Sequence, residues 1–211
     1  MEKKKDIKLD SNPLKETENI FDQIKIDYLT LILGFSLNRP KAAVVKDENS
    51  NLIDWFFVDE YKTAKIFKVV CEKLIKELKL TDDVVLNEYE DGYSGVKSTS
   101  LANYLRTINF DSKKEDFKPE KYFSFEKEMS NDEKFSFLLG KFIRFYNDRK
   151  FILMDGAKNY VTLDLINSLC IGNDKTEAKF YLGISNVVHI TLNPNGVLLE
   201  SLKFWYNKIK E

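Results

Sequence analysis

The strongest constraint on the fold is a helix signal between residues 130 and 146. Ser130 and Glu133 form the S-N-D-E pattern of a capping box, in which each side chain accepts a hydrogen bond from the other residue's backbone N–H. A helix with one apolar face must pack on another element, so this segment predicts a helix lying against a core. The apolar residues that follow recur every three and four positions: Phe135, Leu138, Leu139, Phe142, Ile143 and Tyr146.

Three further segments have the same helical periodicity. The range 15–37 predicts a helix, although its LTLILGF portion also fits a buried strand. Residues 59–79 predict a long amphipathic helix with lysines on its polar face, and 100–108 a short helix capped by Ser98 or Ser100. A turn at 193–196 precedes a predicted C-terminal helix.

Short strands are expected between these helices. Residues 41–45 and 52–58 flank a polar loop and predict a hairpin, and 92–95 predict a turn. The other expected strands are 83–90, 179–184, 187–192 and a pair about an Asp155-Gly156 turn within 150–166, the second of which can also run into a helical turn near Leu165–Leu169. Strands adjacent in sequence favour an α+β class, with a mixed or antiparallel sheet packed by amphipathic helices that include the C-terminal one.

Length and composition indicate a single folded unit. The chain has 211 residues, which suits one domain. We expect a mobile tail over 1–14 and one α+β domain over 15–211, with a possible sub-boundary in a loop at 109–130. No internal repeat is evident in the sequence.

Charge and motif content limit the functional classes. Lys and Arg number 33 against 34 Asp and Glu, so nucleic-acid contact, although possible, has no support from the net charge. The chain has no phosphate-binding glycine loop. It also lacks a leader-like apolar stretch and any run of about 20 apolar residues, which predicts a cytoplasmic protein without a membrane segment.

Glu60 and Lys62 form the most specific chemical pattern. They stand two apart at the end of the predicted strand 52–58, and an acid and a lysine so placed can bind a divalent metal and steady a phosphate. The pair resembles the E-x-K half of the PD-(D/E)xK nuclease motif, which implies a nuclease using Mg²⁺ or Mn²⁺. The second acid would be Asp47 or Asp54, each about 20 Å from Glu60 along an extended strand. Glu60 otherwise fits the first turn of the following helix.

Three other sequence patterns are less specific indications of a catalytic or binding site. The D-G-x-S-G turn at 91–95 resembles that of serine recombinases, and His189 in H-x-T resembles one motif of the 2H phosphoesterases. Lys141 and Arg144 interleave with aromatic residues, as in single-stranded nucleic-acid grooves. On a helix, however, the aromatics would face the core and these two charges would face water.

Without a complete catalytic set, the sequence favours a non-enzymatic protein-binding or regulatory protein, of the kind found in bacterial defence systems and mobile elements. We expect a protein partner and no cofactor. The alternative is the metal-dependent nuclease with Glu60 and Lys62 at its site. The candidate protein-binding residues are aromatic: Trp55, Phe57, Phe117, Tyr122, Phe123 and Phe125.

Overall fold

The computed structural model describes residues 23–36, 51–111, 116–117, 129–147, 150–153, 160–170, 177–181 and 187–210. Its helices are α1 (Tyr28–Ser36), the short 3-10 helix η3 (Val58–Glu60), α2 (Tyr61–Leu78), α3 (Thr99–Asn109), α5 (Asn131–Phe145), α6 (Tyr160–Leu169) and α7 (Val197–Lys210). Its strands are β1 (Leu52–Phe56), β2 (Val85–Glu88), β3 (Ser94–Lys97), β4 (Phe110–Asp111), β5 (Asp116–Phe117), β6 (Tyr146–Asn147), β7 (Lys150–Leu153), β8 (Glu177–Tyr181) and β9 (Val187–Thr191).

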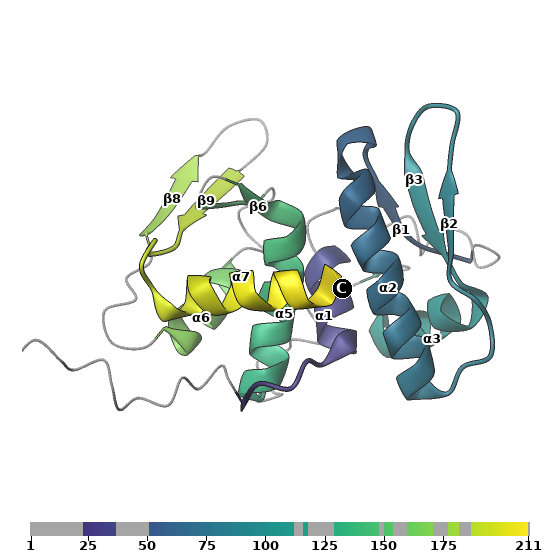
Figure 1. Cartoon of the computed structure of the whole chain (residues 1–211), viewed down its shortest axis with the longest axis horizontal. Helices are drawn as coiled ribbons and strands as arrows, with labels where there is room; N and C mark the ends of the chain where they lie inside the picture. Colours follow the sequence, from purple (N-terminus) through teal and green to yellow (C-terminus); the bar gives the residue numbers. More distant parts are fainter. Residues whose placement is uncertain are drawn as a thin grey trace, which may run out of the picture.

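Helices α1 and α5 lie against each other in the middle of the molecule (Figure 1). Their backbones approach at two glycines. A Cβ on Gly34 would lie 2.2 Å from the backbone oxygen of Phe137, and one on Gly140 would lie 2.2 Å from that of Leu31. Any larger residue at either position would push the helices apart, so glycine is required at both.

The first sheet lies on one side of this helix pair and is built from β1, β2 and β3. Its strand order is β1-β3-β2, with both neighbours antiparallel to β3. Helix α2 covers one face, where the ring of Phe56 packs 5.2 Å from that of Phe67. Burial of a large apolar side chain contributes about 1.5–3 kcal/mol, so this face anchors α2 on the sheet.

The second sheet lies on the other side of the helix pair. Its order is β6-β7-β9-β8, again antiparallel throughout. Helix α5 runs directly into β6. Helices α6 and α7 contribute Ile166, Leu198 and Leu202 to the same buried core as α5.

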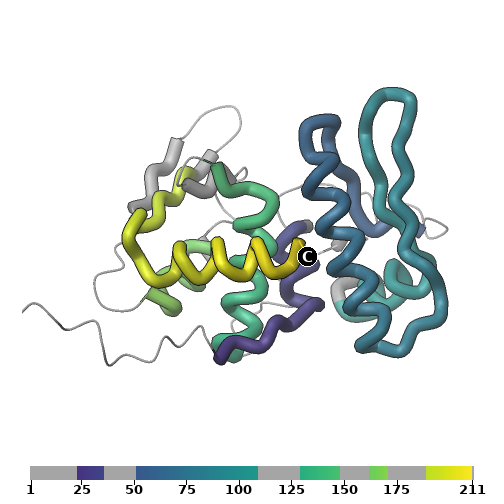
Figure 2. Tube along the Cα trace, viewed as in Figure 1, coloured from purple at the N-terminus to yellow at the C-terminus, as the bar shows by residue number. Residues whose placement is uncertain are grey.

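The chain therefore repeats one topology. The series α1, β1, α2, β2, β3, α3 corresponds to α5, β7, α6, β8, β9, α7, and the sheet order β1-β3-β2 corresponds to β7-β9-β8. Figure 2 shows the elements that follow α1 in the first series on one side of the central helices and α6 on the other, with α7 reaching across from that side. We call residues 28–109 the first repeat and 131–210 the second. The sequence did not reveal this repeat.

The α+β class is confirmed, and the sheets are antiparallel. The predicted capping box is present: the Glu133 N–H donates to Ser130 Oγ at 3.2 Å, and the Ser130 N–H donates to Glu133 Oε2 at 2.9 Å. The helices predicted at 59–79, 100–108 and the C-terminus correspond to α2, α3 and α7. Among the described residues, no helix is long and apolar enough to cross a membrane.

Two local predictions were wrong. Residues 92–95 do not form the turn: the Gly92 N–H donates to the Tyr89 oxygen, so the chain reverses earlier and β3 begins at Ser94. The second strand predicted about the Asp155-Gly156 turn, with a helical turn near Leu165–Leu169 as its possible continuation, is instead helical from Tyr160 to Leu169, because apolar residues in YVTLDLINSL also recur at helical spacing. Only the helical turn at its end was anticipated.

Other predictions lie partly or wholly outside the described residues. Of the helix predicted over 15–37, residues 28–36 form α1, but 24–27 are not helical, so the helix begins later than predicted. Residues 15–22 lie outside the description, as do the tail 1–14 and the strand 41–45. In the loop predicted at 109–130, β4 pairs with β5. The domain boundaries stay predictions.

Candidate functional site

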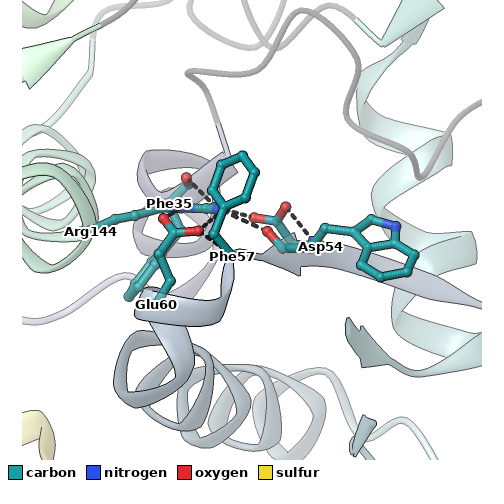
Figure 3. Close-up of polar contacts among 6 residues, drawn as sticks. Phe35, Asp54, Phe57, Glu60 and Arg144 are labelled. Carbon is teal, nitrogen blue, oxygen red and sulfur yellow. Dashed lines mark hydrogen bonds and ion pairs between the residues drawn. The ribbon is translucent and has the colours of Figure 1, made fainter. Parts of the chain in front are cut away.

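A buried arginine joins the two repeats. Arg144 lies in the last turn of α5, and its side chain is 1% exposed. A guanidinium has five N–H donors, and here five hydrogen bonds leave it. All of the acceptors belong to the first repeat (Figure 3).

Two carboxylates bind this guanidinium. Arg144 Nη1 lies 2.5 Å from Asp54 Oδ2, and Arg144 Nε lies 3.0 Å from Glu60 Oε1. Asp54 comes from strand β1 and Glu60 from η3, immediately after that strand. Glu60 also accepts a hydrogen bond from the Phe57 N–H at 2.8 Å, which holds the turn between β1 and α2.

Two backbone oxygens complete the set of hydrogen-bond acceptors around Arg144. Arg144 Nη1 donates to the Phe35 oxygen at 3.0 Å, and Nη2 donates to the Trp55 oxygen at 2.7 Å. The last carbonyls of a helix have no partner within that helix, and Phe35 lies in the final turn of α1. Arg144 therefore caps α1 from the neighbouring helix and fixes the end of β1 beside it.

Burial makes this cluster energetically sensitive. Asp54 and Glu60 are 6% and 18% exposed. Burial of the guanidinium opposes its charge, but the two carboxylates outweigh that effect and raise the pKa of Arg144 above its ordinary value. Removing one partner from such a buried group leaves an uncompensated charge, which costs about 3–5 kcal/mol.

A second buried cation lies one turn earlier on α5. Lys141 is 1% exposed, and its Nζ lies 5.6 Å and 5.2 Å from the ring centroids of Phe137 and Phe145. Burial lowers the pKa of Lys141 well below its ordinary value, and the charge of Arg144 adds to this effect. The expectation that Lys141 and Arg144 face water was therefore wrong. Both lie on the side of α5 that packs inside the protein.

The structure brings two predicted site residues together and separates a third. Asp54 and Glu60 share Arg144, so the expected separation of about 20 Å was wrong: the chain turns through η3 and does not continue as a strand. Lys62 is exposed on the first turn of α2. Residues two apart on a helix do not face each other, so Glu60 and Lys62 do not point the same way. Asp47 lies outside the described residues.

These carboxylates do not fit a divalent metal ion as they stand. A metal-binding carboxylate must have free oxygen lone pairs, whereas the oxygens of Asp54 and Glu60 accept hydrogen bonds from Arg144, Trp55 and Phe57. Within the described part of the chain, no group of three His, Cys, Asp or Glu side chains could hold a metal ion.

Sheet 1 presents a different surface on the side away from α2. Trp55 and Asn87 are both opposite Gly95 in the register, and Val85 is opposite Lys97. Side chains of cross-strand partners point to the same face. We call these five residues the outer face. The other face holds the buried Phe56 and Val96: its residues alternate with those of the outer face.

Aromatic rings extend the outer face. The ring of Trp55 lies 4.6 Å from that of Tyr89, and Lys97 Nζ lies 5.5 Å from the Tyr89 centroid. Val85 is 48% exposed. The surface is thus partly apolar and carries one amide and one cation.

The predicted protein-binding aromatics are divided among several places. Trp55 lies on the outer face, and Phe57 is 47% exposed beside Tyr93, with ring centroids 5.4 Å apart. For Phe117 only the backbone in β5 is described. Tyr122, Phe123 and Phe125 lie outside the described residues.

The sequence matches no protein-family model and no curated protein. The structure is similar to solved structures of the homing endonuclease I-DmoI. One set of mesophilic variants matches with a TM-score of 0.54 and 11% identity, over 83% of this chain and 94% of that chain. A variant in complex with its target DNA and Mn matches with a TM-score of 0.53 and 14% identity, over 92% and 97%. A complex with DNA and Ca matches with a TM-score of 0.51 and 13% identity, over 85% and 87%.

This likeness corrects three expectations. A non-enzymatic protein-binding protein, a protein partner and the absence of a cofactor were expected from the sequence. The similar structures are instead those of an endonuclease, solved with target DNA and with Mn, Ca or Mg. The sequence misled because its charge is balanced overall, and net charge does not report a local surface. At 11–14% identity the likeness concerns the backbone, and the chain shares its fold with the homing endonuclease I-DmoI.

Proposed function

We propose that this protein acts on duplex DNA as an endonuclease, and that the outer face of sheet 1 contacts the DNA. The observation that carries the proposal is the shared fold, which includes 92% of this chain and 97% of an I-DmoI chain solved with its target DNA. A cytoplasmic location stays part of the proposal.

The outer face has the form that DNA contact needs. The major groove of B-DNA admits a β-ribbon, whose side chains can then reach base edges. The β2–β3 hairpin extends at one edge of the molecule beyond α2 (Figure 1). Asn87 and Lys97 offer hydrogen-bond donors from this hairpin, and both are partly exposed. Local donors on a ribbon are compatible with a balanced net charge.

The proposed reaction is hydrolysis of the DNA backbone with a divalent metal. Endonuclease structures of this fold were solved with Mn or Mg. Asp54 and Glu60 are engaged by Arg144, so no catalytic step is assigned to them. The PD-(D/E)xK site stays a prediction with less support, because Glu60 and Lys62 lie on helical turns.

Binding is tested by selecting sites from a random duplex library with the full chain and measuring affinity by fluorescence anisotropy. We expect tight binding to a selected sequence. Lys97→Ala should weaken binding and reduce the slope of log K against log salt by about 0.9, the value for one phosphate contact. Lys62→Ala, an exposed lysine on α2, is the matched control and should change neither quantity. No binding to any duplex would refute the proposal.

Cleavage is tested on plasmids that carry the selected site. We expect conversion of supercoiled DNA to nicked or linear forms with Mg²⁺ or Mn²⁺ and none with EDTA. Lys62→Ala should cleave as well as the unmodified protein. Loss of cleavage in this variant with binding intact would favour the PD-(D/E)xK site instead.

A further inference from the structure

We propose that the outer face of sheet 1 reads A·T base pairs, with Val85 and Trp55 touching the 5-methyl group of thymine and Asn87 bonded to adenine. The inference rests on the proposed function, since it requires that this face enters the DNA. It adds the class of sequence that the face selects.

The apolar part of the face matches thymine. Val85 is 48% exposed at the start of the edge strand β2, and Trp55, whose ring lies 4.6 Å from that of Tyr89, is on the same face in the other edge strand, β1. In the major groove, thymine is the base that presents a methyl group, and apolar side chains recognise it by contact. An exposed valine and a partly exposed tryptophan on one face gain most from that base.

The polar part of the face matches adenine. Asn87 lies two residues from Val85 on the same face of β2, and it is partly exposed. A carboxamide offers one acceptor and one donor, which is the pattern that adenine N6 and N7 require. Asn87 therefore favours adenine and Val85 favours thymine, which are the two bases of an A·T pair.

The outer face carries one group that could read a G·C pair, Lys97, to which the proposed function assigns a phosphate contact. Guanine is read mostly by arginine or lysine. The one cation among the five residues of the outer face is Lys97, whose Nζ lies 5.5 Å from the Tyr89 centroid. Glu88, which could accept a hydrogen bond from cytosine, points to the other face, opposite Ser94, and hydrogen-bonds Tyr61. The described outer face thus lacks the acid and the arginine that G·C readout uses.

The test compares thymine with deoxyuridine, which differs by the methyl group alone. Duplexes selected by the full chain are made with deoxyuridine in place of thymidine in one half-site at a time, and affinity is measured by fluorescence anisotropy. We expect an A·T-rich half-site in which each methyl removed weakens binding about fourfold. Val85→Ala should reduce this discrimination, with the contact of Trp55 remaining. Val58→Ala, the same change at a valine that is 62% exposed outside the sheet, should keep it.

The outcomes separate the two proposals. Equal affinity for thymidine and deoxyuridine duplexes, or selection of G·C-rich half-sites on both sides, would overturn the A·T inference and leave duplex binding standing. Failure to bind any duplex would overturn both. Because the deoxyuridine comparison uses the unmodified protein, it does not depend on whether a variant folds.

Discussion

The two repeats share an order of helices and strands, but their central helices differ in chemistry. Helix α1 has the sequence YLTLILGFS, without a charged residue. Helix α5 begins with an acidic capping box and carries Lys141 and Arg144 on its buried side. The carboxylates that balance Arg144 come from the first repeat, at Asp54 and Glu60.

This difference shows how a repeated topology becomes one interdependent structure. Each repeat provides half of the glycine contact, through Gly34 and Gly140, and that contact is nearly symmetric. The ion cluster is not symmetric, because the second repeat gives the cation and the first gives every acceptor. The first sheet is thereby held to α5 at the point where β1 ends, and its outer face takes its position from that link.

The largest expected effect on stability comes from the ion cluster of Arg144, Asp54 and Glu60. Arg144→Met leaves the buried Asp54 and Glu60 without their cation and should lower the free energy of unfolding by about 3–5 kcal/mol, measured by urea denaturation. Arg106→Met, at an arginine on α3 that bonds Asn103, is the control and should cost about 0.5 kcal/mol or less. A loss below about 1 kcal/mol for Arg144→Met would show that the two repeats do not depend on this link.

The contact between α1 and α5 is tested at its two glycines, Gly34 and Gly140. In an ordinary helix interior, replacing glycine by alanine stabilises by up to about 1 kcal/mol. Here a Cβ at Gly140 would lie 2.2 Å from a backbone oxygen of α1, so Gly140→Ala should destabilise by about 1–3 kcal/mol. Gly34→Ala should behave similarly. Stabilisation by either change in thermal or urea unfolding would contradict the close helix approach.

The smallest expected effect is a pH dependence from the second buried cation. Because burial lowers the pKa of Lys141 well below its ordinary value, the unfolded chain binds the proton more tightly than the folded protein does. The free energy of unfolding should therefore rise as the pH increases towards about 10.5, the pKa of an unperturbed lysine. Lys141→Met should lack this rise. Parallel pH curves for the two proteins would show that burial does not lower the pKa of Lys141.

Local signals in the sequence predicted much of the helical structure. The capping box at Ser130 and Glu133 located α5, and lysines opposite an apolar stripe located α2. Strand β3 was missed because Gly92 and Gly95 both suggest a turn, whereas only Gly92 has a positive φ, of 80°. Strands with glycine need the partner strand to identify them.

The candidate site was less predictable because its contacts are distant in sequence. Arg144 and Asp54 are 90 residues apart, and nothing local indicates that they meet. Two signals were nevertheless present. Arg144 stands within the apolar run FIRF, and Gly34 and Gly140 each follow two aliphatic residues inside a helical pattern. Glycine inside a helix is costly unless another backbone lies close, so this shared position pointed to a paired contact.

The central claim, that the outer face of sheet 1 contacts duplex DNA, can be tested with the two tryptophans of the chain. Trp55 lies on that face, and Trp205 lies on α7 with Lys208 Nζ 4.4 Å from its ring. In Trp205→Phe, the emission of Trp55 should change as the selected duplex is added and saturate with the binding curve. In Trp55→Phe, the emission of Trp205 should stay constant. A response from Trp205 and none from Trp55, with binding confirmed by anisotropy, would contradict the account.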